Sequence, residues 1–135
     1  MGKIEGSQGR GPGAASFEYD FATHGGAVGA ITLTALSGVL PDNAVITRCI
    51  QESITDLTSG GAATVKLGIT GNDDAFLAAT AYSDASFDVD IVTSRAAELP
   101  LKVNAAAGVN ALATIATAAL TAGRFKLHVE WEPGA

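Results

Sequence analysis

Few side chains in this sequence could act as a nucleophile, a general base or a soft metal ligand: His24, His128 and the single cysteine, Cys49. A hydrolase needs its nucleophile within hydrogen-bond reach of a base, and a tetrahedral metal site needs several nitrogen or sulfur ligands at short spacing. These three residues stand far apart in the sequence, and no companion motif surrounds them. We therefore predict solvent-exposed histidines, a buried structural thiol in a reducing cytosol, and no catalytic residue, metal or cofactor.

Carboxylates are the next candidates for chemistry, because oxygen ligands suit calcium. A group of acidic residues lies between positions 73 and 90: Asp73, Asp74, Asp84, Asp88 and Asp90. Asp88 and Asp90 alternate with Val89 and Ile91, which is typical of the solvated face of a strand. The spacing around Asp73 does not match a calcium loop, so we favour a turn there over a metal site.

Aromatic residues could form a platform for sugars. Phe17, Tyr19 and Phe21 alternate with acidic residues, and Trp131 belongs to a similar alternating run. Alternation places the rings on one face of a strand, so a place in the core is favoured over sugar binding. The glycines at 25–29 precede a predicted strand rather than a helix, and so do not form a phosphate cradle.

Composition limits the classes of protein and partner. The chain has 135 residues, 47% hydrophobic and 16% charged, with a net charge of −6. This length and composition predict one folded domain, and the acidic balance without a basic cluster argues against nucleic acid as a partner. No apolar stretch suits a signal peptide, and polar residues interrupt the most apolar segment, 103–120. We expect synthesis in the cytoplasm without Sec export, and no membrane partner.

Alternation of apolar and polar residues is the dominant pattern, and it predicts strands. The segments that show it, or that are rich in small and β-branched residues, are 17–21, 31–35, 65–69, 87–91, 99–103, 112–119 and 125–131. Segment 45–57 also fits helical spacing, but its Val, Ile and Thr residues favour a strand. Pro133 should end the last strand, because proline has no N–H for pairing.

Glycine-rich and Asn/Asp-rich segments separate these strands and predict turns. They lie at 24–26, 38–43, 58–61, 71–74, 107–108 and 122–123. A short helical turn within 75–81 is a further expectation. Seven or eight strands with little helix predict an all-β fold, an antiparallel β-sandwich or jelly roll. This single domain should span residues 15–135, preceded by a flexible arm at 1–14.

Three runs give the sequence a resemblance to a known family: Leu40–Thr47, Thr58–Ile69 and Leu120–Trp131. Their strand and turn patterns look like those of small structural proteins of tailed bacteriophages. In particular, they resemble head decoration, or cement, proteins with a jelly-roll fold. The resemblance implies a non-enzymatic virion protein that binds the outside of the shell of major capsid protein. It would brace the head against the pressure of the DNA inside.

The resemblance also leads to candidate interface residues. An extended arm of 14 residues reaches at most about 45 Å, and we expect Ile4 and Arg10 to become ordered against a neighbouring subunit. Phe76 and Tyr82, in an expected loop at 71–86, are the candidate exposed aromatic contacts. The alternative is a tail or head-fibre domain in which loop aromatics bind a host receptor or glycan.

An oligomer is a further expectation. Ala, Thr and Val dominate the predicted strands, and small side chains each bury little apolar surface. Contacts between subunits would supplement such a core. We therefore predict a homodimer or homotrimer rather than a stable monomer.

Overall fold

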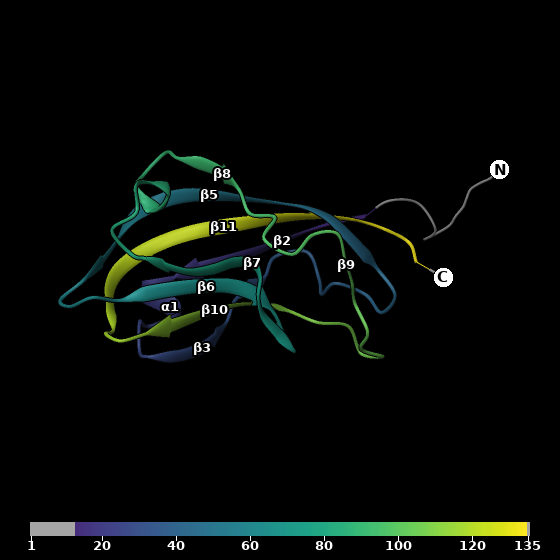
Figure 1. The fold of residues 1–135 in the computed structure, drawn as a ribbon, viewed down its shortest axis with the longest axis horizontal. Coiled ribbons are helices and arrows are strands. Elements are labelled where there is room, and N and C mark those ends of the chain that lie inside the picture. The colour runs from purple at the N-terminus through teal and green to yellow at the C-terminus, as the bar shows by residue number, and fades with distance from the viewer. Residues whose placement is uncertain (1–12, 135) are drawn as a thin grey trace.

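The computed structural model describes residues 13–134 and shows two antiparallel sheets packed as a sandwich (Figure 1). One sheet contains, in order, β3 (Gly29–Thr32), β10 (Ala111–Ala116), β6 (Thr64–Ile69) and β7 (Asn72–Ala81). The other contains β4 (Thr34–Ala35), β2 (Gly13–Asp20), β11 (Leu120–Glu132), β5 (Val45–Ser59) and β8 (Val92–Ser94). A short strand, β9 (Leu101–Lys102), also pairs with β5.

The strand order is that of a jelly roll. Strands β4 and β9 have two residues each. When the other strands in the described part of the chain are renumbered one to eight along the sequence, the sheets read 2-7-4-5 and 1-8-3-6. This arrangement is the pair of interleaved Greek keys that defines a jelly roll. The predicted antiparallel sandwich or jelly roll is therefore confirmed.

The strand predicted from the alternation at 125–131 is confirmed as β11, and it lies in the middle of the six-stranded sheet. Phe125, Leu127 and Val129 are buried, and the strand pairs with β2 on one side and β5 on the other. It ends at Glu132, directly before Pro133, as expected. Segment 45–57 also forms a strand rather than a helix, within β5.

Two predicted strands are interrupted because the chain changes direction within them. The aromatic run stops at Asp20, because the Asp20 carboxylate accepts a hydrogen bond from the N–H of Ala22 and caps the one-turn helix α1 (Phe21–His24). Segment 31–35 divides at the buried Leu33, with β3 in one sheet and β4 in the other.

The predicted strand at 87–91 is wrong. The chain instead forms the 3-10 helix η1 (Ala85–Phe87), capped by Asp84, whose carboxylate accepts a hydrogen bond from Ser86 N–H at 2.9 Å. A bend follows, with Asp90 in the left-handed region at φ 67°. Local side-chain hydrogen bonds to the backbone compete here with strand pairing, which begins only at β8.

Two smaller expectations also fail. Segment 75–81 is part of strand β7 and not a helical turn, because it pairs along β6. The turn expected at 122–123 is instead an irregularity inside β11, where Gly123 has φ 142°. A Cβ at Gly123 would overlap the side chain of Leu57, so glycine allows β5 and β11 to approach closely.

Two residues of the expected arm at 1–14 belong to the folded domain. Gly13 and Ala14 belong to β2, where they pair with Trp131 and Glu130. Residues 1–12, including Ile4 and Arg10, lie outside the described residues.

Candidate functional site

His24 has a structural environment. Its ring stacks on Tyr19, with ring centroids 5.8 Å apart. The Asp20 N–H donates to Nδ1 at 3.1 Å, and Nε2 lies 3.0 Å from the Thr34 hydroxyl. The residue is half-buried rather than solvent-exposed as predicted. Its hydrogen bonds link the end of β2 to β4.

His128 belongs to a chain of hydrogen bonds across three strands. Its Nδ1 lies 3.1 Å from the Ser16 hydroxyl on β2, and its Nε2 lies 3.1 Å from Glu52 Oε1 on β5. The sequence did not predict this contact, because it depends on strand register. His128 is the direct partner of Ser16, while Glu52 lies two residues along β5 from its partner Ile50, on the same face of the sheet.

Ser16, His128 and Glu52 share the hydrogen-bond pattern of a serine hydrolase triad, yet the surrounding structure does not support acyl transfer. A hydrolase also needs N–H donors aimed at the developing oxyanion. Backbone N–H groups of paired strands point along the sheet toward neighbouring strands and not out of its face. The contact therefore ties β2, β11 and β5 together on the outer face of the sheet.

Cys49 is buried on β5, as predicted. Burial raises the pKa of its thiol from 9.0 to about 12, and the Arg95 charge opposes that rise. A thiol that stays protonated is a poor nucleophile and a poor metal ligand.

Arg95 is the centre of a buried polar network beside β8. Its Nε donates to Gln51 Oε1 at 2.6 Å, and its Nη2 donates to the Ser86 hydroxyl at 2.7 Å. The guanidinium lies over the Phe87 ring, 5.2 Å from the centroid, and Gln51 Nε2 donates to Ser53 Oγ at 3.0 Å. Burial lowers the pKa of Arg95, while Asp84 opposes this effect. The network fixes the chain between η1 and β8 against β5.

The acidic residues between 73 and 90 do not converge. Asp73 pairs with Lys66 at 3.0 Å, and Asp84 accepts hydrogen bonds from Ser86, which lower the pKa of Asp84. Asp88 and Asp90 are exposed in the bend before β8. In the part of the chain that the structure describes, no group of histidine, cysteine or acidic residues could hold a metal ion.

The aromatic residues lie mostly in the core. Phe17 and Tyr19 are fully buried, and Phe21 and Trp131 pack against the core, in agreement with their predicted inward alternation. Tyr19 donates to Gly25 O at 2.7 Å. Burial, with a smaller effect of Asp20, raises the Tyr19 pKa to about 12.

The exposure expected of Phe76 is wrong. Phe76 is only 1% exposed, because it lies in strand β7 rather than in a loop. Tyr82 is half-buried and packs against the core just beyond that strand. Phe76 therefore has no surface to offer a partner, and the interface roles of Tyr82, Ile4 and Arg10 stay predictions.

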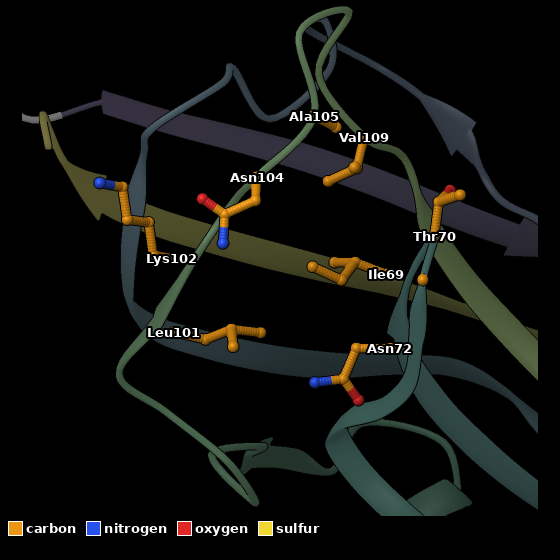
Figure 2. Close-up of a pocket in the computed structure, with 9 residues that line it drawn as sticks. Ile69, Thr70, Asn72, Leu101, Lys102, Asn104, Ala105 and Val109 are labelled. Carbon is orange, nitrogen blue, oxygen red and sulfur yellow. The ribbon is translucent and has the colours of Figure 1, made fainter.

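A pocket of about 200 Å³ opens at one end of the sandwich (Figure 2). Figure 2 shows Ile69, Leu101 and Val109 directed into it, with the side-chain amides of Asn72 and Asn104 at its rim and Lys102 extending away. The Asn72 amide already donates to Glu98 at 2.9 Å. Small-molecule sites are about 300–1,000 Å³, so this pocket fits one or two side chains rather than a cofactor.

Three large apolar side chains are exposed within four consecutive positions, in the bend and at the start of β8. Val89, Ile91 and Val92 are 48%, 40% and 63% exposed, respectively. Exposed apolar patches on soluble proteins often mark contacts with other proteins. None of the helices in residues 13–134 is long and apolar enough to cross a membrane.

No protein-family model and no curated protein matches the sequence. The fold is nevertheless shared with solved structures, and the three described here are chains from phage capsids. A chain of the cyanophage Pam1 capsid asymmetric unit matches with a TM-score of 0.67 and 18% identity, over 96% of this chain and 91% of the other. A chain in the capsid of Ralstonia phage GP4 matches with a TM-score of 0.59 and 21% identity, over 100% and 92%.

A third match is a chain in the acid-stable capsid of Helicobacter pylori bacteriophage KHP30, with a TM-score of 0.58 and 16% identity, over 89% and 86%. Identities this low show a shared fold. The aligned parts cover 86% or more of both chains in each match.

Proposed function

We propose that this protein is a non-enzymatic structural protein of a phage virion. It decorates the head: it binds the outer surface of the shell of major capsid protein and stabilises that shell against the DNA inside. The observation that carries the proposal is the match of the whole jelly-roll domain to chains of several phage capsids.

The arrangement of side chains is consistent with a binding role. The histidines tie strands together, the Cys49 thiol is buried, and the pocket of Figure 2 is lined by apolar groups and amides. What the described surface offers is a set of exposed apolar residues on a rigid sandwich, which suits contact with another protein.

The test is co-sedimentation of the purified protein with heads of the same phage that were assembled without it. We expect saturable binding, and bound particles that release their genome at a higher temperature than bare heads. Absence of binding to heads, with retention on host cells or glycans, would instead support the alternative of a receptor-binding tail or head-fibre domain.

A further inference from the structure

The exposed apolar residues in the bend and at the start of β8 lie close together in the sequence. Val89, Ile91 and Val92 fall within four consecutive positions, next to the edge of the six-stranded sheet. An open hollow of about 440 Å³ adjoins Val89, and its lining also includes Ile54, Asp56 and Ala122. We call the three apolar residues and this hollow the β8 surface. Figure 1 shows β8 beyond β5, at the outer margin of the fold.

Backbone hydrogen bonds hold this segment in one conformation. Val89 N–H donates to Asp56 Oδ1 at 2.6 Å, Asp90 N–H donates to Ser53 O at 2.9 Å, and Ser53 N–H donates to Ile91 O at 2.9 Å. The Arg95 network anchors the same segment from the core side. A surface that is already ordered loses little entropy on binding, so its apolar contacts convert efficiently into affinity.

Carboxylates surround the β8 surface. Asp88 and Asp90 flank Val89 in the chain, Asp56 lines the hollow, and Glu52 is the register partner of Val92; all four acids are exposed. The nearest cations on β11 already face acids: Arg124 pairs with Glu18 at 2.7 Å, and Lys126 is the register partner of both Glu18 and Glu52.

This charge distribution selects the kind of partner. If two copies of the protein bound each other through their β8 surfaces, these acids would face one another in an interface that excludes water. Like charges placed together in an interface raise the free energy of association by several kcal/mol. A partner with an apolar side chain flanked by Lys or Arg would instead fill the hollow and neutralise its rim.

We propose that the β8 surface is where the protein docks on the capsid shell, and that the shell presents an apolar side chain flanked by Lys or Arg at this contact. This inference rests on the proposed function and names the contact that the function requires.

The test compares two exposed valines that differ in location. Val92 is 63% exposed on the β8 surface, and Val28 is 58% exposed just before β3, in the other sheet. Val92→Lys removes the apolar contact and places a positive charge against the proposed basic partner. We expect its Kd for bare heads to rise at least tenfold, whereas Val28→Lys leaves the Kd within twofold of wild type. Thermal melting checks that both variants are folded.

A second pair of variants tests the acidic rim. Asp88→Asn/Asp90→Asn removes two rim charges, and asparagine tolerates the left-handed conformation of Asp90. Glu130→Gln/Glu132→Gln removes two exposed charges from the far end of β11. We expect only the first pair to weaken head binding and to reduce the dependence of the Kd on salt concentration.

The outcomes separate the two proposals. If wild-type protein does not bind heads, the proposed function fails. If wild-type and Val92→Lys bind heads equally, the decoration role stands and the docking inference is overturned. If Val92→Lys changes self-association of the free protein but not head binding, the β8 surface faces a second copy, and the inference is likewise overturned.

Discussion

Removing the Arg95 guanidinium should destabilise the fold by an amount that the structure allows us to work out. In Arg95→Met, Gln51 Oε1 loses its donor while it stays fully buried. An unsatisfied buried acceptor costs about 1–3 kcal/mol, and the lost contact with Phe87 adds about 0.5–1 kcal/mol. Ser86 adds little, because its hydroxyl keeps the hydrogen bond to Asp84 at 2.6 Å.

The expected loss is therefore about 1.5–4 kcal/mol in the free energy of unfolding, measured by urea denaturation. For a domain of this size it corresponds to a fall in Tm of about 5–14 °C. Because the loss comes from one orphaned acceptor, Gln51→Leu in the Arg95→Met background should recover part of it. A single variant within about 0.5 kcal/mol of wild type, or a strictly additive double variant, would refute this account of the network.

Three further predictions follow from other parts of the fold. Gly123→Ala should cost about 3 kcal/mol in urea denaturation, because of its positive φ and the overlap with Leu57, whereas Gly60→Ala, with open space around it, should stay near neutral. The thiol of Cys49 should react with a disulfide reagent only on unfolding. Because the folded pKa of Cys49 is raised from 9.0 to about 12, its contribution to stability is present below pH 9 and is lost as the pH rises toward 12, which alkaline melting curves check. Dilution should lower the melting temperature if the protein is a homodimer or homotrimer, and concentration-independent melting would indicate a monomer.

Local alternation was sufficient to predict most of the sandwich. Side chains of a strand alternate between its two faces, so the run ending at Trp131 revealed both the strand and its inward residues. The same rule failed at 87–91, where the alternation is as regular. There, the hydrogen bonds of Asp84 with Ser86 N–H and of Asp56 with Val89 N–H stabilise a bend instead. The second of these joins residues distant in sequence and carries no local signal.

Contacts between strands could not be predicted, because alternation fixes the face of a residue but not its neighbour. The alignment of Ser16 with His128 depends on the register of β2 against β11. The burial of Phe76 likewise depends on the pairing of β7 with β6, which turned an expected loop into a strand. Alternation predicts that Val89 and Ile91 lie on the inward face of a strand. The bend instead places these side chains in solvent.

The pairing of Gly13 with Trp131 has a mechanical consequence. Strands β2 and β11 are antiparallel, so the start of one and the end of the other lie together at the same end of the sheet. Tension applied between these two points pulls along the direction of the ladder hydrogen bonds and opens them one pair at a time, like a zipper. Tension applied instead between the start of β2 and the start of β11, which lie at opposite ends of this pair, slides one strand past the other and loads all of their pairs together. The sandwich therefore has a weak and a strong direction, and the points at which it is held decide how much force it withstands.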